Sequence, residues 1–515
     1  MTPRPNLPWS LLLLLVALCL GGALACGGDD DDDDASDDDA SIADDDDDDD
    51  ALDDDDDTSD DDAADDDTID DDTADDDIDD ALAKELEERA AAFNEWYNDI
   101  HRSPYGGMGY AIFATPELKK EEIVRFSFGD STIWTGTYAT AEAFRYAVTG
   151  DADAKASAIA AIHTLDTHLK VTQVPGFIAR FAGPDEAPWN NGYTTHDRYV
   201  KGTGDWEGSF WINNTSRDQY TGWFMGMATA YDLVDDEDLR ELIREDVKLV
   251  IDKVVADDFT IIGEDDKPTD AGPKALSTFR LTWLLIAAHV LDDSYYWDLY
   301  ESTFEDDKDG FALSNFSWFN KYDEYYGFNL SHENFYSLFR LETNAERRQF
   351  YLDAFNQQIR KLVVNTHNVF FDAIYLANCE RAGGCDGYDE TLDDMRVQIA
   401  DFQDPPVVEK YLEVPEWPLD PISVFLSDLI DEWGIRELVD IEYQTKDARP
   451  VKWRCPRSFM WQKTPYTLNC DEGDGTEVYP GIDYMVAYWM MRYYDFIAPG
   501  NPNDIYWPEQ DDARR

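Results

Sequence analysis

From about Leu82 onward, apolar residues recur at the spacing of amphipathic helices, and convincing strand patterns are scarce. A pair of helices repeats along this region. The first helix of each pair is apolar nearly all round, as a buried helix is, and the second carries a charged face. Between them lies a polar turn whose residues are good helix N-caps. These pairs are predicted at 134–148 with 152–170, 218–234 with 239–255, 274–291 with 295–304, and 331–341 with 346–363.

Four further helices complete the pattern. Two are of the buried kind, at 368–376 and 481–497, and two are amphipathic, at 82–100 and near 390–399. Six inner and six outer helices predict an all-α fold, the (α/α)6 toroid, in which six hairpins close into a ring. An open solenoid is the alternative, but the lack of a strict repeat period favours the ring. Residues 81–515 then form one domain, with a proline-rich irregular insertion at 401–480.

The N-terminus has the features of an export signal. Arg4 precedes an apolar run and a few small residues, which is typical of a signal peptide at residues 1–25. The residues Ala23-Leu24-Ala25-Cys26 resemble the lipobox of bacterial lipoproteins, in which the cysteine is acylated, although Ala23 stands where Leu is usual. An ordinary cleaved signal is the alternative. The resemblance implies an exported protein, lipid-anchored to the bacterial cell envelope at the outer membrane or the cell surface.

Acidic charge is concentrated directly after Cys26. The chain has 113 Asp and Glu against 41 Lys and Arg, and residues 29–80 contain 35 Asp with no basic or aromatic residue. Such a strip repels itself and has no core, so we predict a disordered tether over 26–80. Calcium binding is the alternative, but the Gly and spaced Glu of an EF-hand loop are absent. The net charge of −72 argues against a nucleic-acid partner, which needs a basic surface.

The cysteines agree with export. Besides Cys19 in the signal and Cys26, the chain has Cys379, Cys385, Cys455 and Cys470. Four cysteines allow three pairings, and the short separations favour the bridges Cys379–Cys385 and Cys455–Cys470. Zinc is the alternative, but there is no CxxC pair and no nearby His, so we expect neither a metal nor a cofactor.

Several segments resemble a known class of protein. They are Trp134-Thr135-Gly136-Thr137-Tyr138, 143–151, 217–222, 230–233, 329–332 and 488–493. Together they resemble exported bacterial proteins of the six-hairpin glycosidase-like class, over roughly 125–497. The resemblance implies the toroid fold. It also implies a carbohydrate as partner, because the better-known members are glycoside hydrolases and polysaccharide lyases.

The candidate site follows from the expected fold. Inner helices of a toroid run parallel, so their N-termini, with unpaired N–H groups and positive dipole ends, share one face. The residues near these starts that carry useful chemistry are, as candidate catalytic groups, Asp218, Glu333, His332 and Asp483, with Asp130 as a substitute carboxylate. The candidate substrate-binding residues are Trp134, Tyr138, Arg180, Trp206, Arg217, Tyr220 and Asn329. Ser216 and Gln219 match an S-x-x-Q capping box at the start of one inner helix.

Three functions compete for this site. A glycoside hydrolase needs one carboxylic acid and one carboxylate, which Asp218 and Glu333 would supply. A polysaccharide lyase would use Tyr220 as base, with His332, Asn329 and Arg217 against a uronate. A monomeric glycan-binding or scaffold protein would need only the aromatic residues. A toroid that binds lipid is disfavoured by the polar residues expected at the opening.

Overall fold

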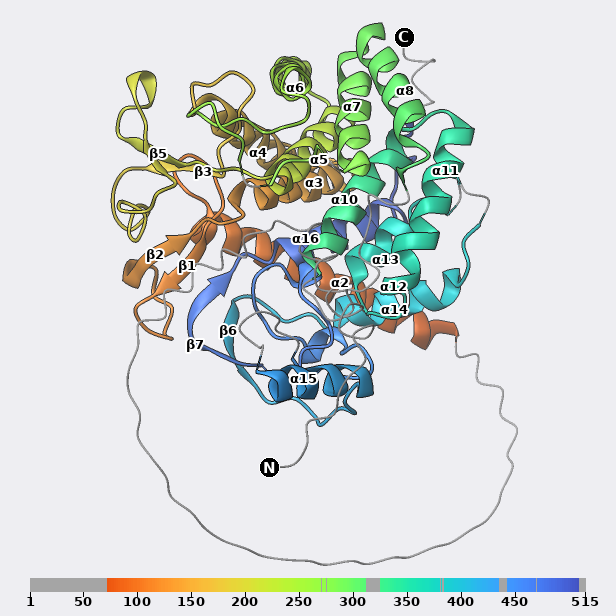
Figure 1. Cartoon of the computed structure of the whole chain (residues 1–515). Coiled ribbons are helices and arrows are strands. Elements are labelled where there is room, and N and C mark those ends of the chain that lie inside the picture. Colours follow the sequence, from red (N-terminus) through yellow and green to blue (C-terminus); the bar gives the residue numbers. More distant parts are fainter. Residues whose placement is uncertain are drawn as a thin grey trace, which may run out of the picture.

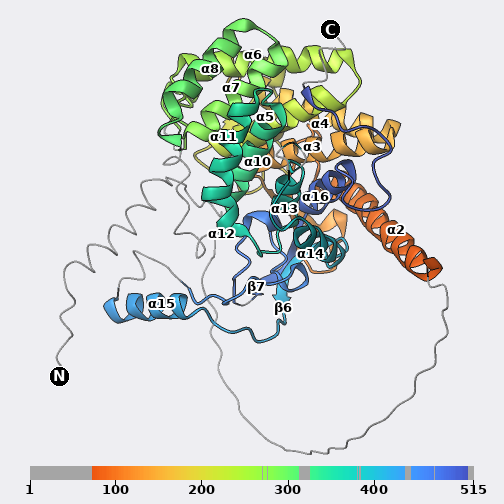
Figure 2. The same ribbon diagram turned by 90° about the vertical axis from the view of Figure 1, so that its right-hand side faces the viewer.

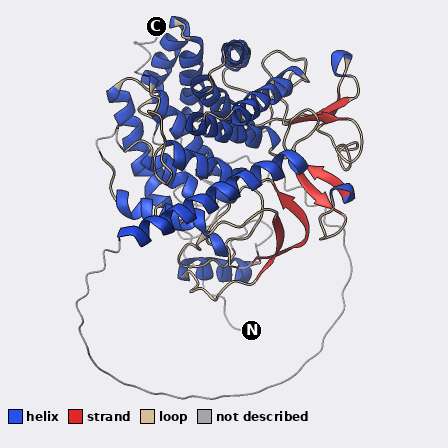
Figure 3. Cartoon of the chain, turned by 180° about the vertical axis from the view of Figure 1, so that it is seen from behind, coloured by secondary structure: helices blue, strands red, loops and turns tan. Residues whose placement is uncertain are grey.

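The computed structural model describes residues 72–508, apart from 270, 275, 312–324, 380, 382–383, 435–441 and 469. The described chain is rich in helix and also contains two small sheets, and Figure 1 shows its elements. Figure 3 shows the strands gathered at one side of the helices. Cys26 and the signal peptide lie outside the described residues.

Helices that are buried nearly throughout alternate along the chain with helices that bury only one face. The buried helices are α3 (Ser131–Thr149), α5 (Arg217–Leu233), α7 (Ser277–Leu291), α10 (Tyr326–Leu341), α13 (Val369–Leu376) and α16 (Ile482–Tyr493). The half-buried helices are α2 (Asp72–Trp96), α4 (Ala152–Lys170), α6 (Glu237–Ala256), α8 (Ser294–Asp307), α11 (Ala345–Phe355) and α14 (Tyr388–Ala400). The alternation follows the predicted pairs closely, and α4 has the predicted bounds.

Each buried helix packs against other buried helices. Helix α3 contacts α5 and α16, helix α7 contacts α5 and α10, and helix α13 contacts α10 and α16. The half-buried helices cover them: α4 packs on α3, α8 on α7, α11 on α10 and α14 on α13. The core is accordingly made by the side chains of the buried helices, with Trp223 and Trp283 among its largest members.

The two sheets are antiparallel and lie in the segments that lead into buried helices. One has the order β2–β1–β7–β6, and the other has the order β3–β5–β4. Ala111 pairs with both Phe126 and Val478, and Trp211 pairs with both Ala182 and Val200. The strands are β1 (Tyr110–Phe113), β2 (Ile123–Ser127), β3 (Phe181–Pro184), β4 (Tyr199–Lys201), β5 (Ser209–Ile212), β6 (Val407–Leu412) and β7 (Cys470–Tyr479). Strands β2, β5 and β7 directly precede α3, α5 and α16, so both sheets adjoin the N-terminal ends of these helices.

Three features differ from the predictions. The all-α description is incomplete, because most of the strands are only three to six residues long and do not alternate apolar with polar residues; β5, for example, is buried at all four positions. Helix α2 begins at Asp72, inside the segment predicted to be a disordered tether. The predicted irregular insertion contains β6, β7 and the helix α15 (Pro421–Trp433), which Figure 2 shows set apart from the main group of helices.

Several short helical turns connect these elements. They are η1 (Tyr97–His101), η2 (Lys120–Glu122), η3 (Gly204–Trp206), η5 (Asn356–Arg360), α12 (Lys361–Val363), η6 (Val451–Trp453) and η7 (Met460–Gln462). Turn η5 interrupts the single helix that was predicted over 346–363.

Candidate functional site

Three carboxyl groups from three different helices come together near the helix starts. Asp130 is the N-cap residue of α3, Asp218 lies in the first turn of α5, and Glu333 is the eighth residue of α10. The negative charges of Asp218 and Asp130 both raise the pKa of Glu333, and the charge of Asp218 raises the pKa of Asp130. The three carboxyl groups therefore lie close enough to act on one another, and we call them the carboxyl cluster.

Glu333 is the most enclosed member of the cluster. Its side chain is fully buried, Oε1 accepts a hydrogen bond of 2.9 Å from Nδ2 of Asn329, and Oε2 has no hydrogen-bond partner. Burial raises the pKa of Glu333 to about 8, the bond from Asn329 opposes this, and the two aspartates add to it. Glu333 consequently keeps its proton at neutral pH.

The two aspartates are more open. The side chain of Asp218 is 28% exposed and lies 3.8 Å from Nε of Arg217, and its Oδ1 has no hydrogen-bond partner. The side chain of Asp130 is 37% exposed and lies 3.9 Å from Nη1 of Arg180. Enclosure by its neighbours raises the pKa of Asp130 despite this opening, and the guanidinium of Arg180 opposes the rise. Neither aspartate is locked in a close ion pair.

Gln219 joins the starts of α3 and α5, in a way that the sequence pattern did not reveal. Its Oε1 accepts hydrogen bonds of 3.1 Å from the backbone N–H groups of Thr132 and Ile133, and its Nε2 donates to Oδ1 of Asp130 at 2.9 Å. Ser216 occupies the N-cap position of α5, but its side chain makes no capping bond. The predicted capping box is therefore wrong: Gln219 caps the neighbouring helix and holds the carboxylate of Asp130.

Glycines let these two helices approach closely. A Cβ atom added at Gly136 would lie 2.0 Å from the carbonyl oxygen of Gly222, and one added at Gly222 would lie 2.5 Å from Cα of Ile133. No side chain fits at either position, so the backbones of α3 and α5 touch. This contact fixes the separation of the helix starts that carry Asp130 and Asp218.

Buried polar atoms without partners gather around the cluster. Among the described residues they include Oγ1 of Thr215, Oγ of Ser216, Nε of Arg217, Oδ1 of Asp218, Oδ1 of Asn329 and Oε2 of Glu333. Almost all buried polar atoms in proteins are hydrogen-bonded, because an unpaired one costs about 1–3 kcal/mol. This concentration of unsatisfied atoms from two helix starts is typical of a site that receives a polar ligand.

Trp134 and Asp483 lie together in a second group. They line a cavity of about 10 Å³ with Tyr110 and Phe459, and the ring of Trp134 stacks on that of Phe459 at 4.2 Å. Asp483 accepts a bond of 2.9 Å from the backbone N–H of Met460. Burial raises the pKa of Asp483 to about 6, while the backbone donors oppose it. Asp483 therefore ties the loop at 460 to the start of α16, which is a structural role.

His332 and Tyr220 are directed into the core instead of toward the carboxyl cluster. His332 stacks on Phe371 at 3.8 Å, its Nδ1 lies 2.7 Å from the carbonyl oxygen of Phe328, and burial lowers its pKa to about 3. The hydroxyl of Tyr220 accepts from the N–H of Ile178 and donates to a backbone carbonyl. Both side chains are buried. We therefore remove both from the candidate site.

Of the other predicted binding residues, some lie beside the carboxyl cluster and others lie away from it. Arg217 and Asn329 border the carboxyl cluster, and Arg180 donates to the carbonyl oxygens of residues 129 and 214 beside Asp130. Tyr138 is buried and donates a bond of 2.7 Å to Oδ1 of Asn94, so it serves the packing of α2 on α3. Trp206 is half-buried on η3, where its nearest aromatic partner is Tyr105, with ring centroids 6.5 Å apart.

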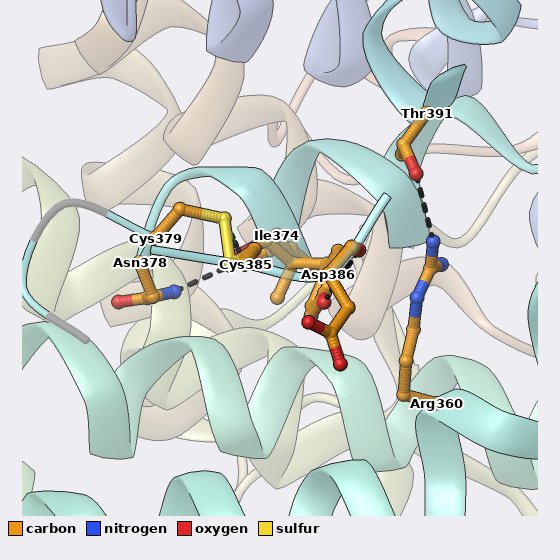
Figure 4. The surroundings of a disulfide bond; sticks show 8 residues. Arg360, Ile374, Asn378, Cys379, Cys385, Asp386 and Thr391 are labelled. Atoms are coloured by element: carbon orange, nitrogen blue, oxygen red, sulfur yellow. Dashed lines mark hydrogen bonds between the residues drawn. A yellow bond between two sulfur atoms is a disulfide. The ribbon is translucent and has the colours of Figure 1, made fainter. Parts of the chain in front are cut away.

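Both predicted disulfides are present. The Cα atoms of Cys379 and Cys385 are 5.0 Å apart, and those of Cys455 and Cys470 are 5.1 Å apart. Figure 4 shows the first bridge at the turn between α13 and α14, where Asn378 donates to the carbonyl oxygen of Ile374. The bridge closes the hairpin of these two helices.

Comparison with protein-family models gives no match for the chain, and no curated protein sequence matches it. In the described part of the chain, no group of three or more His, Cys, Asp or Glu side chains is arranged to hold a metal ion. Within the same ranges, no helix combines the length and the apolar character needed to cross a membrane.

Proposed function

We propose that this protein hydrolyses glycosidic bonds with an acid/base pair of carboxyl groups, Glu333 as the acid and Asp218 as the base. One observation carries the proposal. A carboxyl group that keeps its proton at neutral pH lies within electrostatic reach of a second carboxyl group that is partly open to solvent. Glycoside hydrolysis requires one carboxylic acid, which protonates the leaving oxygen, and a second carboxyl group as base or nucleophile.

In this reaction, Glu333 donates its proton to the glycosidic oxygen as the bond to the anomeric carbon breaks. Asp218 takes a proton from the water whose oxygen forms the new bond to that carbon. The guanidinium of Arg217 lies 3.8 Å from the carboxylate of Asp218. Asn329 holds Oε1 of Glu333 through its amide N–H, which leaves Oε2 for the proton that is transferred.

We also propose that the helices close into an (α/α)6 toroid. The support is a closed series of contacts between the buried helices. Helix α3 contacts α5, α5 contacts α7, α7 contacts α10, α10 contacts α13, α13 contacts α16, and α16 contacts α3 again. The alternation of buried and half-buried helices supports the same arrangement. In such a ring the starts of α3, α5 and α10 share one end, which accounts for the meeting of Asp130, Asp218 and Glu333.

The test is a glycan-degradation screen with the full-length protein, scored for new reducing ends. Asp218→Asn and Glu333→Gln should each lower turnover by a factor of about 10² or more while leaving glycan binding intact. Asp483→Asn is the matched control, because Asp483 acts in backbone capping. Normal turnover by the Asp218 variant would show that this residue has no part in the chemistry.

A glycan-binding protein without catalysis is the second candidate. The complete enclosure of Glu333 favours it, since a binding site has no need to bring an acid to the substrate. Saturable glycan binding without products, unchanged in Glu333→Gln, would establish this function. The lyase is less well supported, because Tyr220 and His332 are held in the core.

We further propose that the protein works as a monomer at the cell envelope, anchored through an acylated Cys26. The support is the resemblance of residues 23–26 to a lipobox and the Asp-rich strip that follows. Cys26→Ser should release the protein from the membrane fraction and abolish incorporation of labelled palmitate. Cys19→Ser, within the signal, is the matched control and should change neither.

A further inference from the structure

Two buried arginines in the predicted insertion, Arg449 and Arg454, make no close ion pair with a described carboxylate. Arg449 is 1% exposed and Arg454 is 4% exposed. Two other buried arginines do meet a carboxylate: Arg340 pairs with Asp232, and Arg360 pairs with an aspartate of α13. Among the residues whose side chains the structure describes, which leaves out Asp471 and Glu472, no carboxylate lies at ion-pair distance from Arg449 or Arg454.

The two guanidinium groups also keep unused donors. Nη2 of Arg449 meets only the disulfide sulfurs of Cys455 and Cys470, at 3.6 and 3.7 Å, and sulfur is a weak acceptor. Nε and Nη1 of Arg449 have no hydrogen-bond partner. Arg454 donates from Nε to the carbonyl oxygen of Arg449 at 3.3 Å and from Nη2 to the backbone of Thr366 and His367, but its Nη1 has no partner.

The two guanidinium groups are neighbours, so the positive charge of each raises the free-energy cost of burying the other. Burial lowers the pKa of Arg449 to about 10. Burial also lowers the pKa of Arg454 to about 10; the phenol of Tyr325 and the more distant carboxylate of Asp394 oppose this, and the charge of Arg449 adds to it. A buried charge without a counter-ion costs several kcal/mol, and arginine rarely avoids this cost because its guanidinium stays protonated.

We propose that Arg449 and Arg454 form a binding site for a small inorganic anion, a halide or a tetrahedral oxyanion, which serves as the internal counter-ion of this part of the fold. The unused N–H groups of Arg449 and Arg454 supply charge-assisted donors, which is the chemistry that binds such anions. Both side chains are closed to solvent, so the occupant is small and has no attached chain. The proposal does not depend on glycoside hydrolysis.

Thermal unfolding of the full-length protein tests the site at constant ionic strength, so that screening of the net charge of −72 stays fixed. Sodium gluconate, whose anion is too bulky to enter, is replaced stepwise by sodium chloride, sulfate or phosphate. Above the dissociation constant, we expect Tm to rise by about 1.5 °C for each tenfold increase in the anion that binds. Comparing the three salts distinguishes a halide from an oxyanion.

Arg449→Met keeps the length of the side chain but removes its charge. This variant should lose the response to the anion, and in gluconate alone it should melt at a higher temperature than the unaltered protein. Arg396→Met is the control, because the side chain of Arg396 is 49% exposed, and it should keep the full response. An equal effect of gluconate and the small anions, or an unchanged response in Arg449→Met, would overturn the proposal.

A second measurement covers the case in which Arg449→Met fails to fold. Crystals of the unaltered protein grown with bromide, or with selenate as the oxyanion, should show anomalous scattering from one of these ions beside Nε and Nη1 of Arg449. The absence of both ions from this position overturns the site. Either ion there, without any effect of halide or oxyanion on Tm, would mean an adventitious ion only and would overturn the counter-ion role.

Discussion

Replacing Glu333 with glutamine tests the electrostatics on which the proposed chemistry depends. Glutamine has nearly the same shape as glutamate and does not ionise. Its amide oxygen can still accept the bond that Nδ2 of Asn329 now donates to Oε1. The substitution therefore removes one titratable group from the protein interior and keeps the shape of the side chain and its bond from Asn329.

The expected change in stability follows from the pKa of Glu333. Burial raises this pKa from 4.5 to about 8, so between these pH values the folded protein holds the proton and the unfolded chain has released it. The unfolded state then binds fewer protons, and the free energy of unfolding falls as the pH rises. At about 1.4 kcal/mol per pH unit, the loss is on the order of 3 kcal/mol at pH 7 and on the order of 5 kcal/mol above pH 8.

Urea unfolding between pH 4 and pH 9 measures this loss. The difference in unfolding free energy between Glu333→Gln and the unaltered protein should grow with pH and level off above about pH 8. Other groups that titrate are common to both proteins and cancel in the difference. Glu95→Gln, at an exposed position of α2, is the matched control and should give a flat difference.

A flat difference for Glu333→Gln would refute the reasoning. It would mean that Glu333 ionises in the folded protein much as it does in the unfolded chain. The assignment of Glu333 as the acid would then fail, even if the variant had lost activity. A sloping difference with full glycan turnover would instead keep the electrostatics and remove the catalytic role.

Four other changes test the packing around the site and the fold. Burial raises the pKa of Asp246 to about 8, and the charge of Asp166 adds to this, so Asp246→Asn should raise the urea midpoint above pH 8 and change it little below pH 4. Gln219→Leu leaves two backbone N–H groups of α3 without an acceptor and should cost about 1–3 kcal/mol in urea unfolding. Replacing Cys455 and Cys470 by serine should cost roughly 3 kcal/mol, and removing the other bridge, whose cysteines are only 6 residues apart, roughly 2 kcal/mol.

Much of the helical arrangement could be predicted because it depends on local signals. The periodicity of apolar residues and the polar turns gave α4 its bounds and placed the starts of α3, α5 and α16 within a few residues. The short strands could not be predicted. A segment such as β5 (Ser209–Ile212) is stabilised by pairing with β3 and β4 on either side of it, and four buried residues carry no periodicity of their own.

Within the candidate site, the sequence predicted which residues lie near a helix start, but it did not predict the direction in which each side chain points. Asp218, Arg217 and Asn329 lie near helix starts as expected, and they border the carboxyl cluster. His332 is adjacent to Glu333 in sequence, but successive residues of a helix point in directions about 100° apart. One therefore stacks on Phe371 while the other joins the cluster.

The role of Gln219 shows why the chemistry of this site depends on contacts between helices. Asp130 follows a glycine at the start of α3, and its side chain makes no capping bond to its own helix. Gln219 of α5 provides that cap, which leaves one carboxylate oxygen of Asp130 bonded to an amide and the side chain 37% exposed. Because the cap comes from α5, the backbone N–H groups at the start of α3 have an acceptor while the carboxylate of Asp130 remains partly exposed beside Asp218 and Glu333. The charges of Asp130 and Asp218 both raise the pKa of Glu333.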